Sequence, residues 1–210
     1  MANREKALEV AYDFIKSKEG LYSAARGGYV RVRKDAPSST PIYAYWDKFG
    51  KVWTIGWGSI YRRDGSKVQE SDVITKAEAD KRIEEETNKW EKYLSTKIDT
   101  TRLNENQYAA LISIAYNAGG GGLMKSRIAT AVNKNLPKEE VAKVISDSLV
   151  TAKGVFVQGL ANRRRAEAQL YLTPVLPTSS GNKGKNVALY VGIAIVSVGA
   201  SLYLYNKLSA

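Results

Sequence analysis

The apolar positions at the start of the chain recur at three- and four-residue steps, with charged residues between them. This repeat is carried by Ala7, Val10, Ala11, Phe14 and Ile15. Such spacing predicts an amphipathic helix with one buried face, and Gly20 is placed to end it. Glu19 would then lie at the carboxyl end of the helix, where the helix dipole opposes a negative charge and should raise the pKa of the side chain.

The stretch 21–42 loses the helical repeat. It begins with a short alternating run and continues into a segment rich in Pro and Ser, which predicts a short strand or ribbon followed by an exposed loop. Its cations Arg31, Arg33 and Lys34 are typical of a solvated edge that blocks strand pairing, and an anionic substrate is the other partner they could meet.

The next stretch, 43–58, is dense in aromatic and β-branched residues on both sides of a turn near Gly50. This composition predicts a hairpin with Asp47 and Thr54 on opposite arms. Its three tryptophans fit a sugar-binding surface and the core of a small sheet equally well.

Helical patterns occupy the following hundred or so positions. Thr75 and Glu78 have the spacing of a capping box and predict a helix to about Leu94, and the nearly continuous apolar run 108–118 predicts the buried axis of a helical lobe. The glycine run 119–122 is expected to end that axis; it lacks the strand before and the Gly-Lys-Ser/Thr after that a phosphate-binding loop requires. Further helices are predicted over 126–134, 138–149 and 160–172.

This order of elements predicts an α+β fold, with a small β-sheet lobe, a larger helical lobe and a cleft between them. The predicted domain covers residues 1–172, and a Pro/Ser/Gly-rich linker follows over 173–186. Residues 187–205 contain no charge and would extend about 28 Å as a helix, which predicts a transmembrane segment ahead of a short tail, 206–210. A buried segment of the fold is the alternative. Charges throughout residues 1–16 predict that there is no amino-terminal signal peptide.

The amino-acid composition excludes several classes of active site. The chain has no Cys and no His, which excludes thiolate or imidazole zinc sites, Ser-His-Asp triads and Cys-His dyads, so we expect no metal and no cofactor. The net charge of +11 favours anionic partners in general. No nucleic-acid-binding motif accompanies it, and nucleic acid is not expected as a partner. Glu19 at the predicted helix end and Asp47 and Thr54 on the predicted hairpin offer two carboxyl groups and a hydroxyl, which is what glycoside hydrolysis requires.

A series of short motifs runs from about Leu8 to Leu172. They are Glu19-Gly20, Ala44-Tyr45-Trp46-Asp47, Trp53-Thr54-Ile55-Gly56-Trp57-Gly58, and the segments 73–79, 103–111, 116–119 and 159–167. In this order the motifs resemble those of phage-type lysozymes (endolysins, glycoside hydrolase family 24), so a lysozyme-like fold is expected.

The resemblance implies a function and roles for single residues. Glu19 would be the general acid, Asp47 would activate the attacking water and Thr54 would help to hold that water. The implied reaction is cleavage, with inversion and without a cofactor, of the β-1,4 bond between N-acetylmuramic acid and N-acetylglucosamine in peptidoglycan. It further implies that the substrate-binding residues include Tyr116, Asn117, Ser126 and Arg163. Arg163 could instead serve an internal ion pair.

Three departures from the family pattern bear on the site. The interval from Glu19 to Asp47 is longer than the family's, which indicates an insertion within 21–42. One extra residue lies between Gly50 and Thr54 and is expected to need a β-bulge. Ser59 stands where many relatives have His. Two other functions therefore stay open: a lytic transglycosylase, which manages with one Glu, and an inactive, membrane-anchored protein that binds the cell wall.

The predicted span 187–205 implies a second partner, the lipid bilayer. We expect a single-pass protein anchored by its carboxyl end, in the internal membrane of a virion or in the host inner membrane facing the periplasm.

Overall fold

The structure, a computed structural model, describes residues 2–48 and 50–175. Its helices and strands are, in chain order, α1 (Arg4–Glu19), β1 (Tyr22–Ala25), β2 (Gly28–Arg31), β3 (Pro41–Tyr43), β4 (Tyr45–Asp47), β5 (Val52–Thr54), β6 (Val73–Thr75), α2 (Lys76–Ser95), the 3-10 helix η1 (Thr100–Arg102), α3 (Glu105–Ala118), α4 (Gly120–Lys125), α5 (Arg127–Asn133), α6 (Lys138–Asp147), β7 (Thr151–Ala152), β8 (Val155–Phe156) and α7 (Gln158–Leu172).

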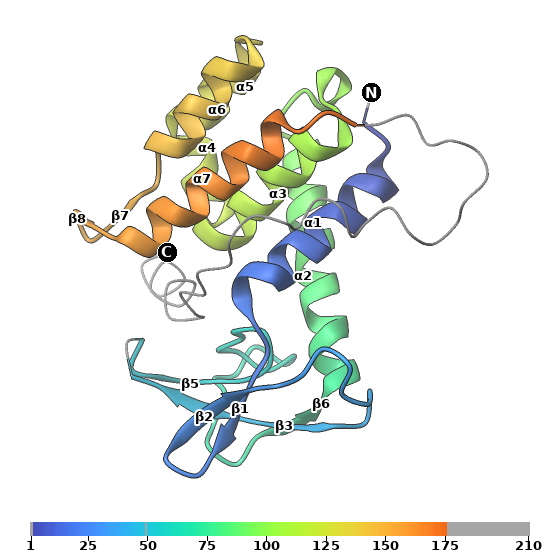
Figure 1. Ribbon diagram of the computed structural model, residues 1–210, viewed down its shortest axis with the longest axis vertical. Helices are drawn as coiled ribbons and strands as arrows, with labels where there is room; N and C mark the ends of the chain where they lie inside the picture. The colour runs from blue at the N-terminus through green and yellow to red at the C-terminus, as the bar shows by residue number, and fades with distance from the viewer. Residues whose placement is uncertain (1, 49, 176–210) are drawn as a thin grey trace.

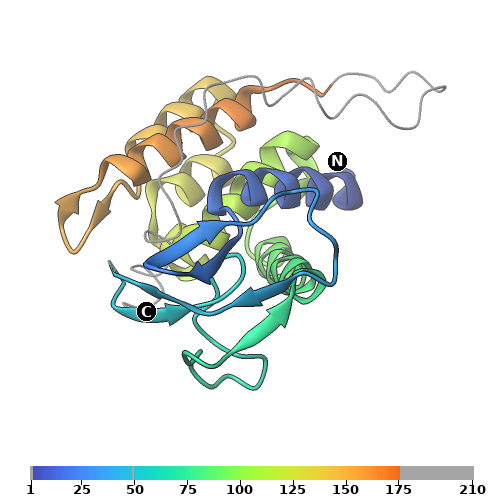
Figure 2. The same ribbon diagram turned by 60° about the horizontal axis from the view of Figure 1, so that its bottom comes forward.

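These elements form two lobes (Figure 1). The six strands β1 to β6 lie in one lobe, helices α3 to α7 form the other, and α1 and α2 connect the two. Figure 2 shows α7 and α6 stacked on the side of α3 that faces away from the strands. The predicted α+β arrangement of a small β lobe and a larger helical lobe is therefore confirmed for the described residues.

Local sequence signals set the ends of the main helices. The Asn3 side chain accepts a hydrogen bond from the backbone N–H of Lys6 and caps α1. Full capping boxes open α2, through Thr75 and Glu78, and α3, through Asn104 and Gln107. The predicted capping box at Thr75 is confirmed.

Two hydrophobic clusters form the interior. The larger surrounds α3, whose residues from Tyr108 to Asn117 are all buried, as expected of a central axis. The smaller joins the strands to α2 and to the end of α1, and includes Ile15, Ile42, Ile55 and Trp57. Because α1 and α2 contribute to the smaller cluster, the strands are packed on helices rather than on a second sheet.

The strands pair as separate two-stranded ribbons. The β4–β5 pair is antiparallel, with Tyr45 opposite Thr54 and Asp47 opposite Val52. The expectation of a β-bulge is wrong, because this register is regular; the extra residue is taken up in the loop, where Lys51 adopts a φ of 51°. The ribbon predicted within 21–42 is confirmed as the β1–β2 pair, and β3 pairs with β6 across the intervening chain.

The glycine run begins a helix as well as ending one. Gly119 closes α3 with a φ of 75°, as predicted. Gly120 to Gly122, however, form the first turn of α4, which the sequence pattern did not predict. Gly120 is buried because α4 packs directly on α2 at this point.

A polar cluster around Asp80 ties the lobes together. Its carboxylate accepts hydrogen bonds from Nζ of Lys16 in α1 at 2.8 Å, from Nε1 of Trp57 at 3.0 Å and from Nζ of Lys76 at 3.1 Å. The Lys16 ammonium also lies over the Trp57 ring, 4.8 Å from its centroid. One carboxylate thus connects α1, α2 and the segment after β5.

Across residues 2–48 and 50–175, no helix has both the length and the apolar character needed to cross a bilayer. The span predicted at 187–205 lies outside the described residues, as does most of the predicted linker.

The contact between α4 and α2 predicts a sharp difference between two neighbouring glycines. A Cβ on Gly120 would lie 2.6 Å from Cδ1 of Tyr93 and 2.8 Å from Cζ3 of Trp90, whereas a Cβ on Gly121 would meet nothing within 4 Å. We expect Gly120→Ala to lower the free energy of unfolding by about 1–3 kcal/mol through overpacking. The matched control Gly121→Ala should be neutral or up to about 1 kcal/mol more stable. Urea unfolding of both variants tests this, and equal stabilities would contradict the packing described here.

Candidate active site

Glu19 is the last residue of α1, and the chain leaves the helix at Gly20 with a φ of 71°. Glycine is needed here for two reasons. Residues with a side chain rarely adopt this φ, and a Cβ at this position would lie 2.9 Å from Cε2 of Tyr22. The turn leads directly into β1, so the Glu19 carboxyl is left where the first helix meets the strands. It is buried, with 2% of the residue exposed.

Asp47 and Thr54 lie on paired strands and face the same side. Partners across a pair share a face, so Thr54, opposite Tyr45, and Asp47, two residues further along β4, are diagonal neighbours. Asp47 is 2% exposed and Thr54 is fully buried, whereas Trp46 between Tyr45 and Asp47 points outward. The hairpin brings Asp47 and Thr54 together as the sequence predicted.

Arg163 of α7 forms an ion pair with Glu19 at the end of α1, and so joins two helices that are far apart in the sequence. Its Nη1 donates a hydrogen bond to Oε1 of Glu19, and its Nε donates one to Oε1 of Glu167 at 3.2 Å. Arg163 and Glu167 are one turn apart on α7, so they share a face of the helix. The internal ion pair considered for Arg163 is therefore present, and it is made with the predicted general acid.

A second layer of buried polar groups holds Glu167. Nε of Arg164 lies 2.8 Å from its Oε2, and the hydroxyl of Ser113 in α3 donates to its Oε1 at 2.7 Å. Arg164 also donates to Oδ1 of Asn117 at 2.7 Å. Both Arg164 and Glu167 are fully buried. Burial of a charge is tolerated only when partners of this kind surround it.

Burial raises the pKa of the Glu19 carboxyl, and the Arg163 guanidinium opposes this shift without cancelling it. The predicted direction is therefore confirmed, with burial as its main cause. The same burial lowers the pKa of Arg164 to about 10. A carboxyl group that stays protonated towards neutral pH is suited to act as a general acid.

Tyr45 lies two residues before Asp47 on the same face of β4. Burial raises the pKa of its phenol, and the charges of Asp47 and Glu19 add to that shift. The Tyr45 hydroxyl is buried and makes no hydrogen bond within the described part of the chain. Such a donor is typically satisfied by ordered water or by a ligand oxygen.

The other predicted substrate-binding residues have structural partners. Asn117 is 2% exposed and holds Arg164, as described above. Tyr116 is buried in the smaller hydrophobic cluster. Ser126 caps α5: its hydroxyl accepts from the backbone N–H of Ile128 at 3.2 Å and donates to the carbonyl of Leu123 at 2.6 Å. Among the described residues, no hydrogen bond or ion pair joins Ser126 to Glu19.

Tyr45, Arg164 and Glu167 were not predicted as members of the site. Arg164 and Glu167 were visible as opposite charges three residues apart on a predicted helix, a spacing at which an ion pair can form. Tyr45 could have been found from strand alternation, because it lies two positions before Asp47 and so shares its face.

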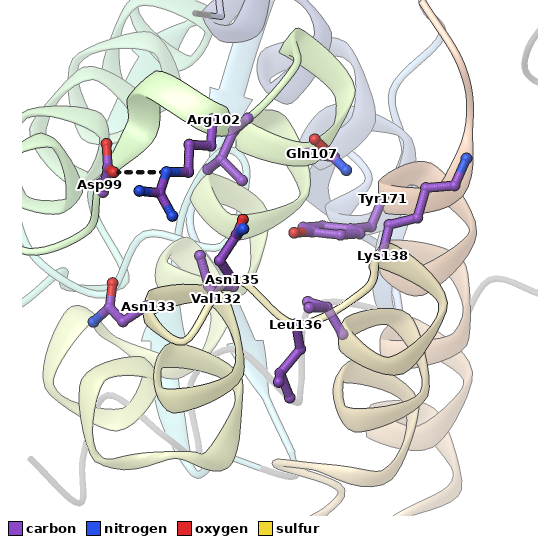
Figure 3. A pocket seen from close by; sticks show the side chains of 11 residues that line it. Asp99, Arg102, Gln107, Val132, Asn133, Asn135, Leu136, Lys138 and Tyr171 are labelled. Atoms are coloured by element: carbon purple, nitrogen blue, oxygen red, sulfur yellow. Dashed lines mark ion pairs between the residues drawn. The ribbon is translucent and has the colours of Figure 1, made fainter.

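Two pockets lie away from these residues. One, of about 150 Å³, is lined by side chains from η1, α5, α6 and α7, with Arg102 3.5 Å from Asp99 (Figure 3). The other, of about 370 Å³, is lined by residues around Arg62, Asp72 and Arg82 in the strand lobe. Neither includes Glu19, Asp47 or Thr54. Within the described ranges, no group of His, Cys, Asp and Glu side chains is arranged to hold a metal ion.

Comparison with known proteins gives consistent matches. Residues 40–167 match the sequence profile of the phage lysozyme family. The endolysin of Lactococcus phage c2 is 28% identical over 162 residues, which cover 74% of this chain and 64% of that protein. The endolysin of Bacillus phage B103 is 32% identical over 171 residues, 79% of this chain and 53% of that protein. The chain thus spans less than two thirds of the length of either relative.

A solved structure extends the match to the fold. The endolysin from Escherichia coli O157:H7 phage FAHEc1 superposes with a TM-score of 0.60 at 29% identity. The match covers 84% of this chain and 97% of that one.

The raised pKa of Glu19 predicts that Glu19→Gln stabilises the protein at pH 7. The protonated form is favoured by folding, so its contribution is complete below the unfolded-state pKa, near 4.5, and is lost as the pH rises through the higher folded-state value. Gln stays neutral at every pH, so the gain over the parent should shrink as the pH falls to 4. Urea unfolding at pH 4 and pH 7 measures it.

Glu9→Gln, on the exposed side of the same helix, is the control and should change the free energy of unfolding by less than about 0.5 kcal/mol. A Glu19→Gln variant less stable than the parent at pH 7 would contradict the stated direction.

Proposed function

The chain belongs to the phage lysozyme family, and on that premise we propose that it is a peptidoglycan hydrolase that cleaves the β-1,4 bond between N-acetylmuramic acid and N-acetylglucosamine. The observation that carries the proposal is the buried Glu19 carboxyl, with its raised pKa, held by Arg163 beside a hairpin that presents Asp47 and Thr54. These are the groups that acid/base hydrolysis of a glycoside requires.

In the proposed mechanism Glu19 gives its proton to the glycosidic oxygen as the bond to the anomeric carbon breaks. Water attacks that carbon from the opposite face, and its proton passes to Asp47, with Thr54 helping to hold the water. The products are a new reducing end, with inverted configuration, and a new hydroxyl on the neighbouring sugar. Arg163 is a positioning residue, which fixes the Glu19 carboxyl through its hydrogen bond to Oε1.

We further propose that the enzyme is tethered to a membrane by residues 187–205. The support is the uncharged sequence of that segment and its length, which matches a bilayer core. Tethering to a virion's internal membrane would serve local wall opening during entry, and tethering to the host inner membrane facing the periplasm would serve lysis. In both cases the enzyme is held within reach of the wall.

Digestion of purified peptidoglycan tests the reaction. The full-length protein in mild detergent should release muropeptides with reducing ends, and Glu19→Gln and Asp47→Asn should each lower the rate by roughly 10²- to 10⁴-fold. Mass spectrometry separates the outcomes. Anhydro products that persist in Asp47→Asn would assign a lytic transglycosylase, and binding without cleavage by the parent would assign a wall-binding protein.

Fractionation tests the tether. The full-length chain should stay with membranes after an alkaline wash and be released by detergent, because a helix of this length buries its apolar side chains in the bilayer. A variant lacking 187–205 should be found in the soluble fraction with its hydrolytic activity intact. Recovery of the intact full-length chain only from soluble fractions of infected cells and particles would rule out both locations.

A further inference from the structure

The β1–β2 ribbon, residues 21–32, lies beside both ends of the candidate site. At one end the ring of Tyr22 packs on Gly20, next to Glu19. At the other end the ring of Tyr29 lies on that of Tyr45, with centroids 4.6 Å apart, two residues from Asp47. The ribbon therefore lies next to the predicted acid, Glu19, and next to the strand that carries the predicted base, Asp47.

The ribbon is fixed in this position. The Ser23 hydroxyl accepts a hydrogen bond from the backbone N–H of Tyr43 at 3.0 Å, and Tyr22 forms a bridge with Gly56 beyond β5. The rings of Tyr22 and Tyr29 also meet edge to face, with centroids 5.3 Å apart. These contacts distinguish it from a solvated loop, and Figure 2 shows it lying between α1 and the other strands.

The ribbon face that touches Tyr45 is partly exposed, at Tyr29 and Arg31. Tyr22 pairs with Arg31 and Ala24 with Tyr29, so Tyr22, Tyr29 and Arg31 share the face that touches Tyr45. Tyr29 is 42% exposed although it rests on Tyr45. An exposed aromatic ring next to a guanidinium suits a ligand that has both an apolar sugar face and a negative charge.

The charges around the ribbon are unbalanced. Residues 21–46 contain four cationic side chains and one acidic side chain, Asp35. Asp35 is taken by Arg33, whose Nε and Nη2 donate to its two oxygens at 2.9 and 2.7 Å. Arg31 is exposed and makes no ion pair with any of the described residues. It is therefore available to an external carboxylate.

We propose that the β1–β2 ribbon is a substrate subsite, in which Tyr29 packs against the glycan strand and Arg31 pairs with a carboxylate of a peptide stem attached to that strand. The proposal rests on the proposed function, because peptidoglycan is the glycan that carries such stems. It gives the insertion within 21–42 a role in choosing stem-bearing strands over bare ones.

The test compares two substrates: peptidoglycan with its stems, and glycan strands from which an amidase has removed them. With the full-length protein, Arg31→Gln should raise KM for the stem-bearing substrate about two- to fivefold, the range of an exposed ion pair, and leave kcat unchanged. KM for bare strands should not change. Arg33→Gln is the matched control, since Arg33 is already paired with Asp35, and should behave like the parent on both substrates.

Equal changes on the two substrates, or no change on either, would overturn the subsite. Binding of the two substrates to Glu19→Gln, with and without Arg31→Gln, separates this result from failure of the proposed function. A parent that cleaves nothing overturns the hydrolase. Whether or not the parent cleaves, the subsite is supported if Glu19→Gln binds stem-bearing strands better than bare ones and the double variant with Arg31→Gln does not. If Glu19→Gln binds both substrates equally well, the subsite is overturned.

Discussion

The candidate site depends on one guanidinium placed between two buried carboxylates. Arg163, near the start of α7, binds Glu19 at the end of α1 and Glu167 one turn further along α7. Removing the guanidinium would leave the buried Glu19 carboxylate without its counter-charge, and the loss of one partner of a buried pair in this way typically costs about 3–5 kcal/mol. The interaction therefore fixes the rotation of α7 against α1 and at the same time fixes the carboxyl that is to give up a proton.

The surrounding structure supplies buried polar partners for this ion pair. The central helix α3 is buried along most of its length, and its polar residues Ser113 and Asn117 turn towards the charges of α7. Burial then raises the pKa of Glu19 despite the neighbouring guanidinium. The protein thereby holds its acid in a state that costs stability near neutral pH, and the rest of the fold offsets that cost. The Asp80 cluster contributes by holding α1 and α2 to the strands.

Features set by local sequence were predictable, and those set by contacts across the chain were not. The capping box at Thr75, the buried axis 108–118 and the hairpin bearing Asp47 follow from patterns within a few turns or one hairpin, and all three were found. The first turn of α4 was missed because three glycines have low helix propensity, which packing against α2 overrides. The pairing of Arg163 with Glu19 could not be predicted from local sequence either, because the two residues are 144 positions apart and no periodic pattern joins them.

The segment 21–42, where an insertion is predicted, shows where this fold can change without disturbing the site. The backbone of β1 pairs with β2 and makes one further bridge, from Tyr22 to Gly56, so the ribbon takes no strand from the β3–β6 and β4–β5 pairs. The segment 21–42 begins and ends in the smaller hydrophobic cluster, at Leu21 and Ile42, both buried, and closing a longer loop between fixed ends costs little. The added residues are thereby confined to the border of the site, where they can alter what is bound without moving Glu19 or Asp47. An insertion within β4 or β5 would have no such freedom, because the register of that pair sets the position of Asp47 relative to Thr54.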